Sequence, residues 1–182
     1  MAVLTAVLCS LLPSFAIGDT ELFQTDKLIG AIISDDYELA KSILIRGHDA
    51  NPVDNYRRTP LILAAMAGKA DLVELLAENK ANLGAKDVAG GSALHYAAAQ
   101  GYVDVAELLI ELGAEIDIEN RQGMTPLLKA AADGKIEIVQ LLLNRNADTT
   151  HHDYTGRSAL MWAQRNGRTI IVRLLRQAGI SK

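Results

Sequence analysis

The sequence of this chain returns at a fixed interval of 33 residues. Four triplets of one shape begin at positions 59, 92, 125 and 158, namely Thr59-Pro60-Leu61, Ser92-Ala93-Leu94, Thr125-Pro126-Leu127 and Ser158-Ala159-Leu160. A fixed period in this range is typical of repeat architectures, whose units bury their apolar faces against one another. The chain is therefore predicted to form an elongated, curved stack of similar units.

Each period predicts a turn, a short helix, a glycine, a longer helix and a loop. In the second unit Thr59 can cap a helix that begins at Pro60 and runs to about Ala67, because proline suits the first helical position. Gly68 and its counterparts Gly101, Gly134 and Gly167 are expected to take positive φ where that helix ends. The longer helices carry apolar stripes expected in the core: Leu72, Val73, Leu75 and Leu76; Val105, Ala106, Leu108 and Leu109; Ile138, Val139, Leu141 and Leu142.

Small residues on the short helices predict that neighbouring units approach closely, at Ala64-Ala65, Ala97-Ala98 and Ala130-Ala131. Aromatic residues make up only 4% of the chain, so Ala, Leu, Ile and Val must form most of this core. The first unit lacks the triplet but keeps apolar columns at Leu28, Ile32, Leu39, Ile43 and Leu44, as expected of a cap. In the last unit Arg176 occupies the column of Ala77, Ile110 and Leu143, which predicts a second cap.

Two units, "DVAGGSALHYAAAQGYVDVAELLIELGAEI" and "NRQGMTPLLKAAADGKIEIVQLLLNRNADT", resemble ankyrin repeats, whose pattern runs D-x-x-G-x-T-P-L-H-x-A-A, then Gly, V-x-L-L and G-A-D. The resemblance implies an all-α ankyrin-repeat solenoid of about five helix-turn-helix repeats, with projecting β-turn fingers and capping repeats at both ends. It implies one domain over residues 17–182, with repeats at approximately 21–53, 54–86, 87–119, 120–152 and 153–182. Arg57 replaces the turn glycine, and the family's histidine occurs only at His95; both departures are expected to weaken local hydrogen bonding without threatening the fold.

The opening segment "MAVLTAVLCSLLPSFA" is uncharged and too short to span a bilayer comfortably. Residues 1–16 are predicted to be a signal peptide, since small residues at Ser14 and Ala16 suit cleavage after Ala16. The mature chain is then expected in the periplasm or outside the cell, with no cysteine, because Cys9 is the only one. A positive n-region is missing, and the first basic residue is Lys27, so an uncleaved apolar helix or a mis-set start in a cytoplasmic protein remain alternatives.

No catalytic or cofactor motif is found, so we expect a non-enzymatic protein without a cofactor. A net charge of -4 argues against nucleic-acid binding. His151-His152-Asp153 contains metal-competent groups, but a loop in which Asp153 caps a turn is favoured over a metal site. His95 is expected to tie its helix to the neighbouring turn, and Glu74, Glu107 and Glu111 are interpreted as a solvated face.

In ankyrin repeats the concave groove and its projecting turns are the usual protein-binding surface, so the resemblance implies which columns contact a partner. Residues four apart on the short helices share one face. The predicted contact set is Asn55, Tyr56, Arg58, Leu63, Tyr96, Gln100, Arg121, Gln122, Met124, Lys129, Asp133, Tyr154, Arg157, Trp162 and Asn166. Tyr, Trp, Arg and Met are the residue types enriched in interfaces, and replacing Tyr96 or Trp162 by Ala is expected to reduce binding while the fold persists.

A second candidate surface is the basic end of the chain, where residues 157–182 hold six basic residues and no acidic one. It is either a solvated cap or a docking end for an acidic partner or an anionic membrane. The favoured hypothesis is a small exported bacterial protein, expected to be monomeric, that binds another protein. It is similar to periplasmic ankyrin-repeat proteins associated with catalase and oxidative-stress defence. The alternatives are an inhibitor or immunity protein that occludes a toxin, and a cytosolic adaptor.

Overall fold

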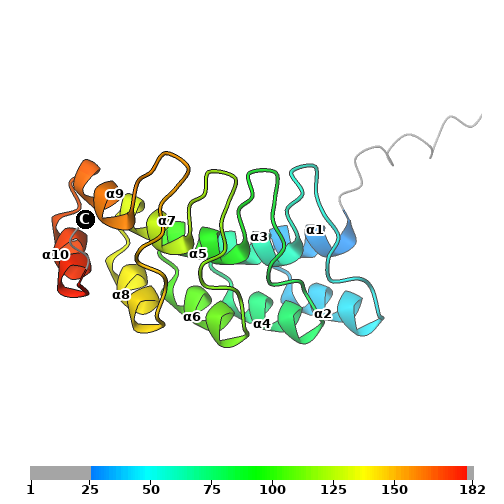
Figure 1. The fold of residues 1–182 in the computed structure, drawn as a ribbon. Coiled ribbons are helices and arrows are strands. Elements are labelled where there is room, and N and C mark those ends of the chain that lie inside the picture. The colour runs from blue at the N-terminus through cyan, green and yellow to red at the C-terminus, as the bar shows by residue number, and fades with distance from the viewer. Residues whose placement is uncertain (1–25, 180–182) are drawn as a thin grey trace, which may run out of the picture.

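The computed structural model describes residues 26–179, which form a curved stack of helix pairs (Figure 1). The ten helices of this part are α1 (Lys27–Ile33), α2 (Tyr37–Ile45), α3 (Pro60–Ala67), α4 (Ala70–Glu78), α5 (Ala93–Gln100), α6 (Val103–Glu111), α7 (Pro126–Asp133), α8 (Ile136–Asn144), α9 (Ala159–Arg165) and α10 (Thr169–Gln177). Odd-numbered helices form an inner row and even-numbered helices an outer row. Four loops project from the inner row as fingers, with tips at residues 54–58, 87–91, 120–124 and 153–157. The predicted all-α repeat solenoid is confirmed.

The repeated Thr or Ser and Gly residues set the bounds of the inner helices. Thr59 accepts a hydrogen bond from the Ile62 amide at 3.3 Å, and Ser92, Thr125 and Ser158 cap α5, α7 and α9 in the same way. Gly68 ends α3 at φ 70°, and a side chain there would also collide with the ring of Tyr102 from the next repeat. In the last repeat the helix ends earlier, at Arg165, although Gly167 keeps a positive φ.

The alanine pairs of the inner helices are fully buried, as predicted. Ala64, Ala65, Ala97, Ala98 and Ala130 are each 0% exposed and belong to one core that runs through every repeat. Since the small side chains let α3, α5 and α7 pack closely, burial between repeats supplies most of the stabilisation, at roughly 25 cal/mol for each Å² of apolar surface.

Three residues of the predicted apolar stripes are not core. Leu39 is 45% exposed, and Leu108 and Leu141 are only partly buried. Outer helices are covered on one side only, so the margin of their apolar stripe faces solvent. Leu39 lies on α2, the outer helix of the first described repeat, where no earlier described repeat covers it.

Backbone hydrogen bonds join successive fingers into a row. The amides of Val88, Arg121 and Tyr154 donate to carbonyl groups of the preceding finger, at Tyr56 (3.0 Å), Ala89 (3.2 Å) and Gln122 (3.0 Å). Within the described residues the only β-type pairing outside these contacts is one bridge between His152 and Ser158. The fingers therefore support one another without forming a regular sheet.

Arg57 does not weaken its turn in the way the sequence suggests. Its amide donates to the Asp54 carbonyl at 2.9 Å, as the Gly90 amide does to Asp87 at 3.0 Å. The substitution instead places a non-glycine residue at φ 59°, which costs about 1–2 kcal/mol of conformational energy. The departure thus affects backbone strain and leaves the turn hydrogen bond intact.

The predicted signal peptide, residues 1–16, and Cys9 lie outside the described residues. Among the helices found within residues 26–179, none combines the length and apolar character that crossing a bilayer requires.

Candidate functional site

The finger turns are built around an acidic or amide side chain at one repeated position. Oδ1 of Asp87 accepts the amides of Ala89 and Gly91, both at 2.8 Å. Oδ1 of Asp153 likewise accepts the amides of Thr155 and Arg157, both at 2.9 Å, which confirms the turn-capping role predicted for Asp153. Asp54 and Asn120 make the same pair of contacts in their own fingers.

The second carboxylate oxygen of each turn aspartate binds a side chain of the same repeat. Tyr96 donates its hydroxyl hydrogen to Asp87, and Trp162 donates its indole N–H to Asp153 at 2.8 Å. In the second repeat the inner-helix position holds Leu63, and Arg58 binds Asp54 instead, with Nε at 2.7 Å. Tyr96 and Trp162 therefore connect inner helices to finger tips, in addition to any contact with a partner.

These contacts shift the ionisation of the groups involved. Burial, followed by the hydrogen bond to the Asp87 carboxylate, raises the pKa of Tyr96 to about 12. Burial alone would raise the pKa of Asp153, but hydrogen bonds from Thr155, the Arg157 amide and Trp162 outweigh it and lower that pKa to about 2. At neutral pH both sides of each contact keep the protonation state that the hydrogen bond requires.

Guanidinium groups lie over the aromatic rings at both ends of the finger row. Arg58 lies over the ring of Tyr56 at 4.8 Å, and Arg157 and Arg165 lie over the ring of Trp162 at 5.2 and 5.4 Å. Cation–π contacts of this kind hold an arginine beside a ring while leaving N–H groups for a partner. Arg165 was not in the predicted set, although its spacing of three residues from Trp162 on α9 signals the contact.

The remaining inner-helix residues of the predicted set differ in how far they are available. Leu63 is partly buried against the core, whereas Gln100 is exposed. Lys129 and Asp133 form an ion pair with each other at 3.1 Å. Asn166 donates from Nδ2 to the Ala132 carbonyl at 2.9 Å and so joins α9 to the preceding repeat.

The tips of the fingers carry the most exposed residues of the predicted set. Tyr56 is 60% exposed and Tyr154 is 73% exposed. Asn55, Arg121 and Gln122 are exposed as well. Each of these side chains can contact a partner without prior rearrangement of the fold.

A hollow of about 400 Å³ lies along the row of fingers, and it includes Arg121 and Tyr154. Its other lining residues include Arg57, Lys86 and Glu119, which sequence reasoning did not single out. Tyr154 donates to Glu119 at 3.1 Å, and Lys86 donates to the Glu119 carbonyl at 2.7 Å. The missed residues occupy finger columns adjacent to those selected, so their charge was the available signal.

Met124 is a correction to the predicted contact set. Its side chain is only 7% exposed and belongs to the hydrophobic core. An unbranched apolar thioether gains free energy by filling such a site, so burial outweighs the interface preference on which the prediction rested.

His95 has the tying role that the sequence predicted. Nε2 donates to the Met124 carbonyl at 2.8 Å, and Nδ1 lies 2.9 Å from the Ser92 hydroxyl. Burial lowers the pKa of His95 below 6.5, so the ring is neutral at physiological pH. The contact joins α5 to the next finger.

The His151-His152-Asp153 segment is divided among separate contacts. His151 lies 2.9 Å from the Gly123 carbonyl through Nε2, His152 is exposed, and Asp153 is occupied by its turn. Within residues 26–179 no group of three or more His, Cys, Asp or Glu side chains is arranged to hold a metal ion.

Two glutamates on the outer row are paired rather than merely solvated, which corrects the interpretation of that face. Arg145, at the end of α8, lies 2.7 Å from Glu107 and 3.3 Å from Glu111 on α6. These ion pairs join successive repeats. Glu74 is exposed and makes no ion pair within the described residues.

A comparison with protein families finds one matching description, ankyrin repeats (3 copies), over residues 28–120 and 113–182. The two matched segments together run continuously from the start of α1 to the end of the sequence.

Proposed function

The chain belongs to the ankyrin-repeat family, and on this premise we propose that it binds a partner protein through its inner surface. The inner surface means the accessible parts of the odd-numbered helices together with the four finger tips. Ankyrin repeats are generally protein–protein interaction modules and typically have no enzymatic activity. The binding role is therefore the general expectation for this chain, and the surface and partner are our proposal.

The observation that carries this assignment is the exposure of large aromatic residues on fingers that are held in place. Tyr56 and Tyr154 stand mostly in solvent, while backbone hydrogen bonds between neighbouring fingers fix their carriers. Aromatic anchors on a preorganised surface lose little entropy on binding, which is the condition for an interface hot spot.

The test uses a photoreactive amino acid at single positions of the full chain in its native host. Gln122, on a finger tip, serves as the inner position, and Gln140, exposed on α8, serves as the outer position. The proposal expects one protein to cross-link from position 122 and not from position 140. Cross-linking of the same protein from both positions, or from position 140 alone, contradicts it.

Once that protein is purified, the variant Tyr56→Ala should weaken its binding by about 2 kcal/mol if Tyr56 is a true hot spot. The matched control is Glu74→Ala with Gln140→Ala, since both side chains are exposed on the outer row and neither forms an ion pair within the described residues. Tyr96 and Trp162 are poorer first choices, because their replacement also removes a hydrogen bond from a turn aspartate.

We propose further that the chain is exported and that the mature form begins after Ala16, because residues 1–16 combine an uncharged apolar run with small residues before the cleavage point. In the periplasm its partner would be a protein of oxidative-stress defence. Mass spectrometry of chain purified from its host gives the mass of the N-terminus directly, and an intact Met1 in the cytoplasmic fraction contradicts export.

A further inference from the structure

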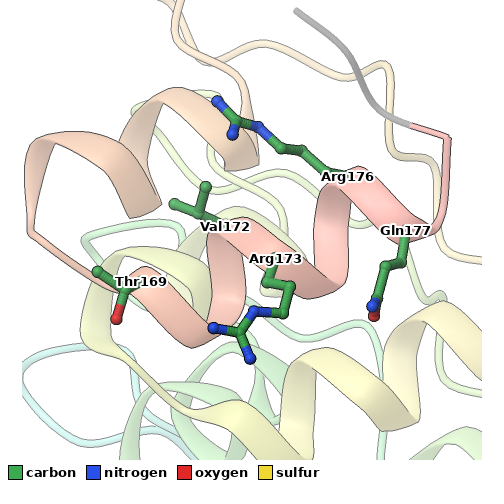
Figure 2. Close-up of a pocket in the computed structure, with 5 residues that line it drawn as sticks. All are labelled: Thr169, Val172, Arg173, Arg176 and Gln177. Carbon is green, nitrogen blue, oxygen red and sulfur yellow. The ribbon is translucent and has the colours of Figure 1, made fainter.

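The outer helix of the last described repeat presents one long face to solvent. Thr169, Val172, Arg173, Arg176 and Gln177 recur at the spacing of a single helix face on α10 and line a hollow of about 390 Å³ (Figure 2). In Figure 2 Arg173 and Gln177 extend to one side of the helix and Val172 and Arg176 to the other. Four of these residues are exposed, and Val172 is partly buried.

The same face is covered in every earlier outer helix from α4 onward. Val73, Ala106 and Val139 occupy the column of Val172 and are each 0% exposed. In α6 the cover includes charge pairing: Arg145 of the next repeat binds Glu107 and Glu111. The face of α10 therefore has the geometry that receives one more outer helix.

Its charge is the reverse of the charge on α6. Arg173 stands 66 residues after Glu107, in the same column, and Gln177 stands 66 residues after Glu111. Arg176 replaces the apolar residues Ile110 and Leu143 of the earlier helices. A helix that docks on this face in the manner of α8 on α6 needs a carboxylate where α8 carries Arg145.

The surroundings add to this positive charge. Asp153 is the last acidic residue of the sequence, and five arginines follow it: Arg157, Arg165, Arg168, Arg173 and Arg176. None of the five lies within ion-pair distance of a carboxylate in the described part of the chain. Arginine pairs well with carboxylates because its planar N–H groups match their two oxygens.

We propose that the exposed face of α10 binds an acidic amphipathic helix of a partner protein, which packs against it as an additional outer helix. Val172 provides the apolar contact, and Arg173 and Arg176 pair with carboxylates of the incoming helix. This surface is separate from the inner surface, because it lies on the outer row, so the proposal does not depend on the proposed function.

A second copy of this chain does not meet the requirement. Its first outer helix, α2, ends at Arg46, which is exposed and holds the same position that Arg145 holds at the end of α8. End-to-end stacking would bring Arg46 against Arg173, and two like charges in contact repel. The charge pattern therefore favours a different, acidic protein over self-assembly.

The test measures peptide binding to the full chain by titration at low and high salt. One probe is an amphipathic peptide of about 18 residues made of Leu, Ala and Glu, long enough to form a helix, and its twin carries Lys in place of each Glu. The wild-type chain should bind the Glu peptide at least about tenfold more tightly than the Lys peptide, and salt should reduce the difference.

The double variant Arg173→Glu, Arg176→Glu should reverse this preference and bind the Lys peptide. The control Arg46→Glu, Lys80→Glu makes the same change in net charge at exposed positions of other repeats and should keep the wild-type preference. Circular dichroism confirms that both variants are folded.

Equal binding of the two peptides by the wild-type chain overturns the proposal, and so does a double variant that still prefers the Glu peptide. A further arm uses vesicles of mixed phosphatidylcholine and phosphatidylglycerol. Co-sedimentation with these vesicles without binding of the Glu peptide identifies an anionic membrane as the occupant and also overturns the proposal.

Discussion

At the scale of single residues, the turn aspartates divide their two oxygens between backbone and side-chain donors. One oxygen of Asp87 or Asp153 holds the finger in its turn, and the other holds the inner helix through Tyr96 or Trp162. Periodicity alone predicted the first contact, since the acid recurs in a turn column. It could not predict the second, because Tyr and Trp at an exposed column equally suggest binding anchors. Only the geometry shows that these rings also serve the fold.

We predict that His95→Leu changes the pH dependence of stability. At neutral pH the variant should be less stable by about 1–3 kcal/mol, because Ser92 and Met124 lose a buried hydrogen-bonding partner. The folded ring resists protonation because its pKa is lowered, whereas the unfolded ring keeps its usual value of 6.5. As the pH falls below that value the unfolded wild-type chain binds protons first, so wild type loses stability that the variant does not have.

Urea unfolding of both proteins at a series of pH values checks this. The difference in free energy of unfolding should shrink as the pH falls from about 7 to about 5. His48, His151 and His152 are present in both proteins, so they cancel in the comparison. A difference that stays constant over this range contradicts the lowered pKa of His95.

At the scale of helices and fingers, the sequence predicted element bounds well and burial less well. Thr59, Pro60 and Gly68 mark the two ends of α3 because each makes a local backbone contact that the sequence itself encodes. Burial depends on which neighbour covers a face. Leu39 and Met124 were therefore misplaced in opposite directions, one expected in the core and found exposed, the other expected at an interface and found buried.

Packing between inner helices leads to a prediction for α5. Ala97 is 0% exposed on the helix between α3 and α7. Replacing it with Leu should overpack this contact and destabilise the chain by roughly 1–3 kcal/mol. The matched control is Ala67→Leu, at an exposed helical position, where the same added volume meets solvent. Thermal unfolding compares the two variants, and an unchanged midpoint for Ala97→Leu means that the assigned interface is wrong.

At the scale of the whole molecule, each described repeat packs against its sequence neighbours, so position along the stack sets how far a local defect spreads. Helices of the central repeats are covered on two sides, whereas α10 is covered by α8 and α9 and leaves its outer face exposed. Stability in such a stack is approximately a sum of repeat terms and nearest-neighbour terms. The same loss of core volume should therefore act differently in the middle and at the last described repeat.

Leu109 and Leu175 provide a matched pair for this prediction. They occupy one column, on α6 and α10, and both are 0% exposed. Either Leu→Ala change removes the same side-chain volume, at a cost of about 2–5 kcal/mol to the repeat that contains it. In Leu109→Ala that cost falls on a repeat that both neighbours need, so the midpoint of global unfolding should drop.

In Leu175→Ala the last helix pair can open while the rest of the stack stays folded, because only one repeat interface is lost. Hydrogen exchange should then accelerate in α9 and α10, with little change in the amides of α3 to α6. Leu109→Ala should instead accelerate exchange on both sides of α6. Equal acceleration along the whole chain in both variants would mean that the repeats unfold as one unit, and the nearest-neighbour description would not hold for this protein.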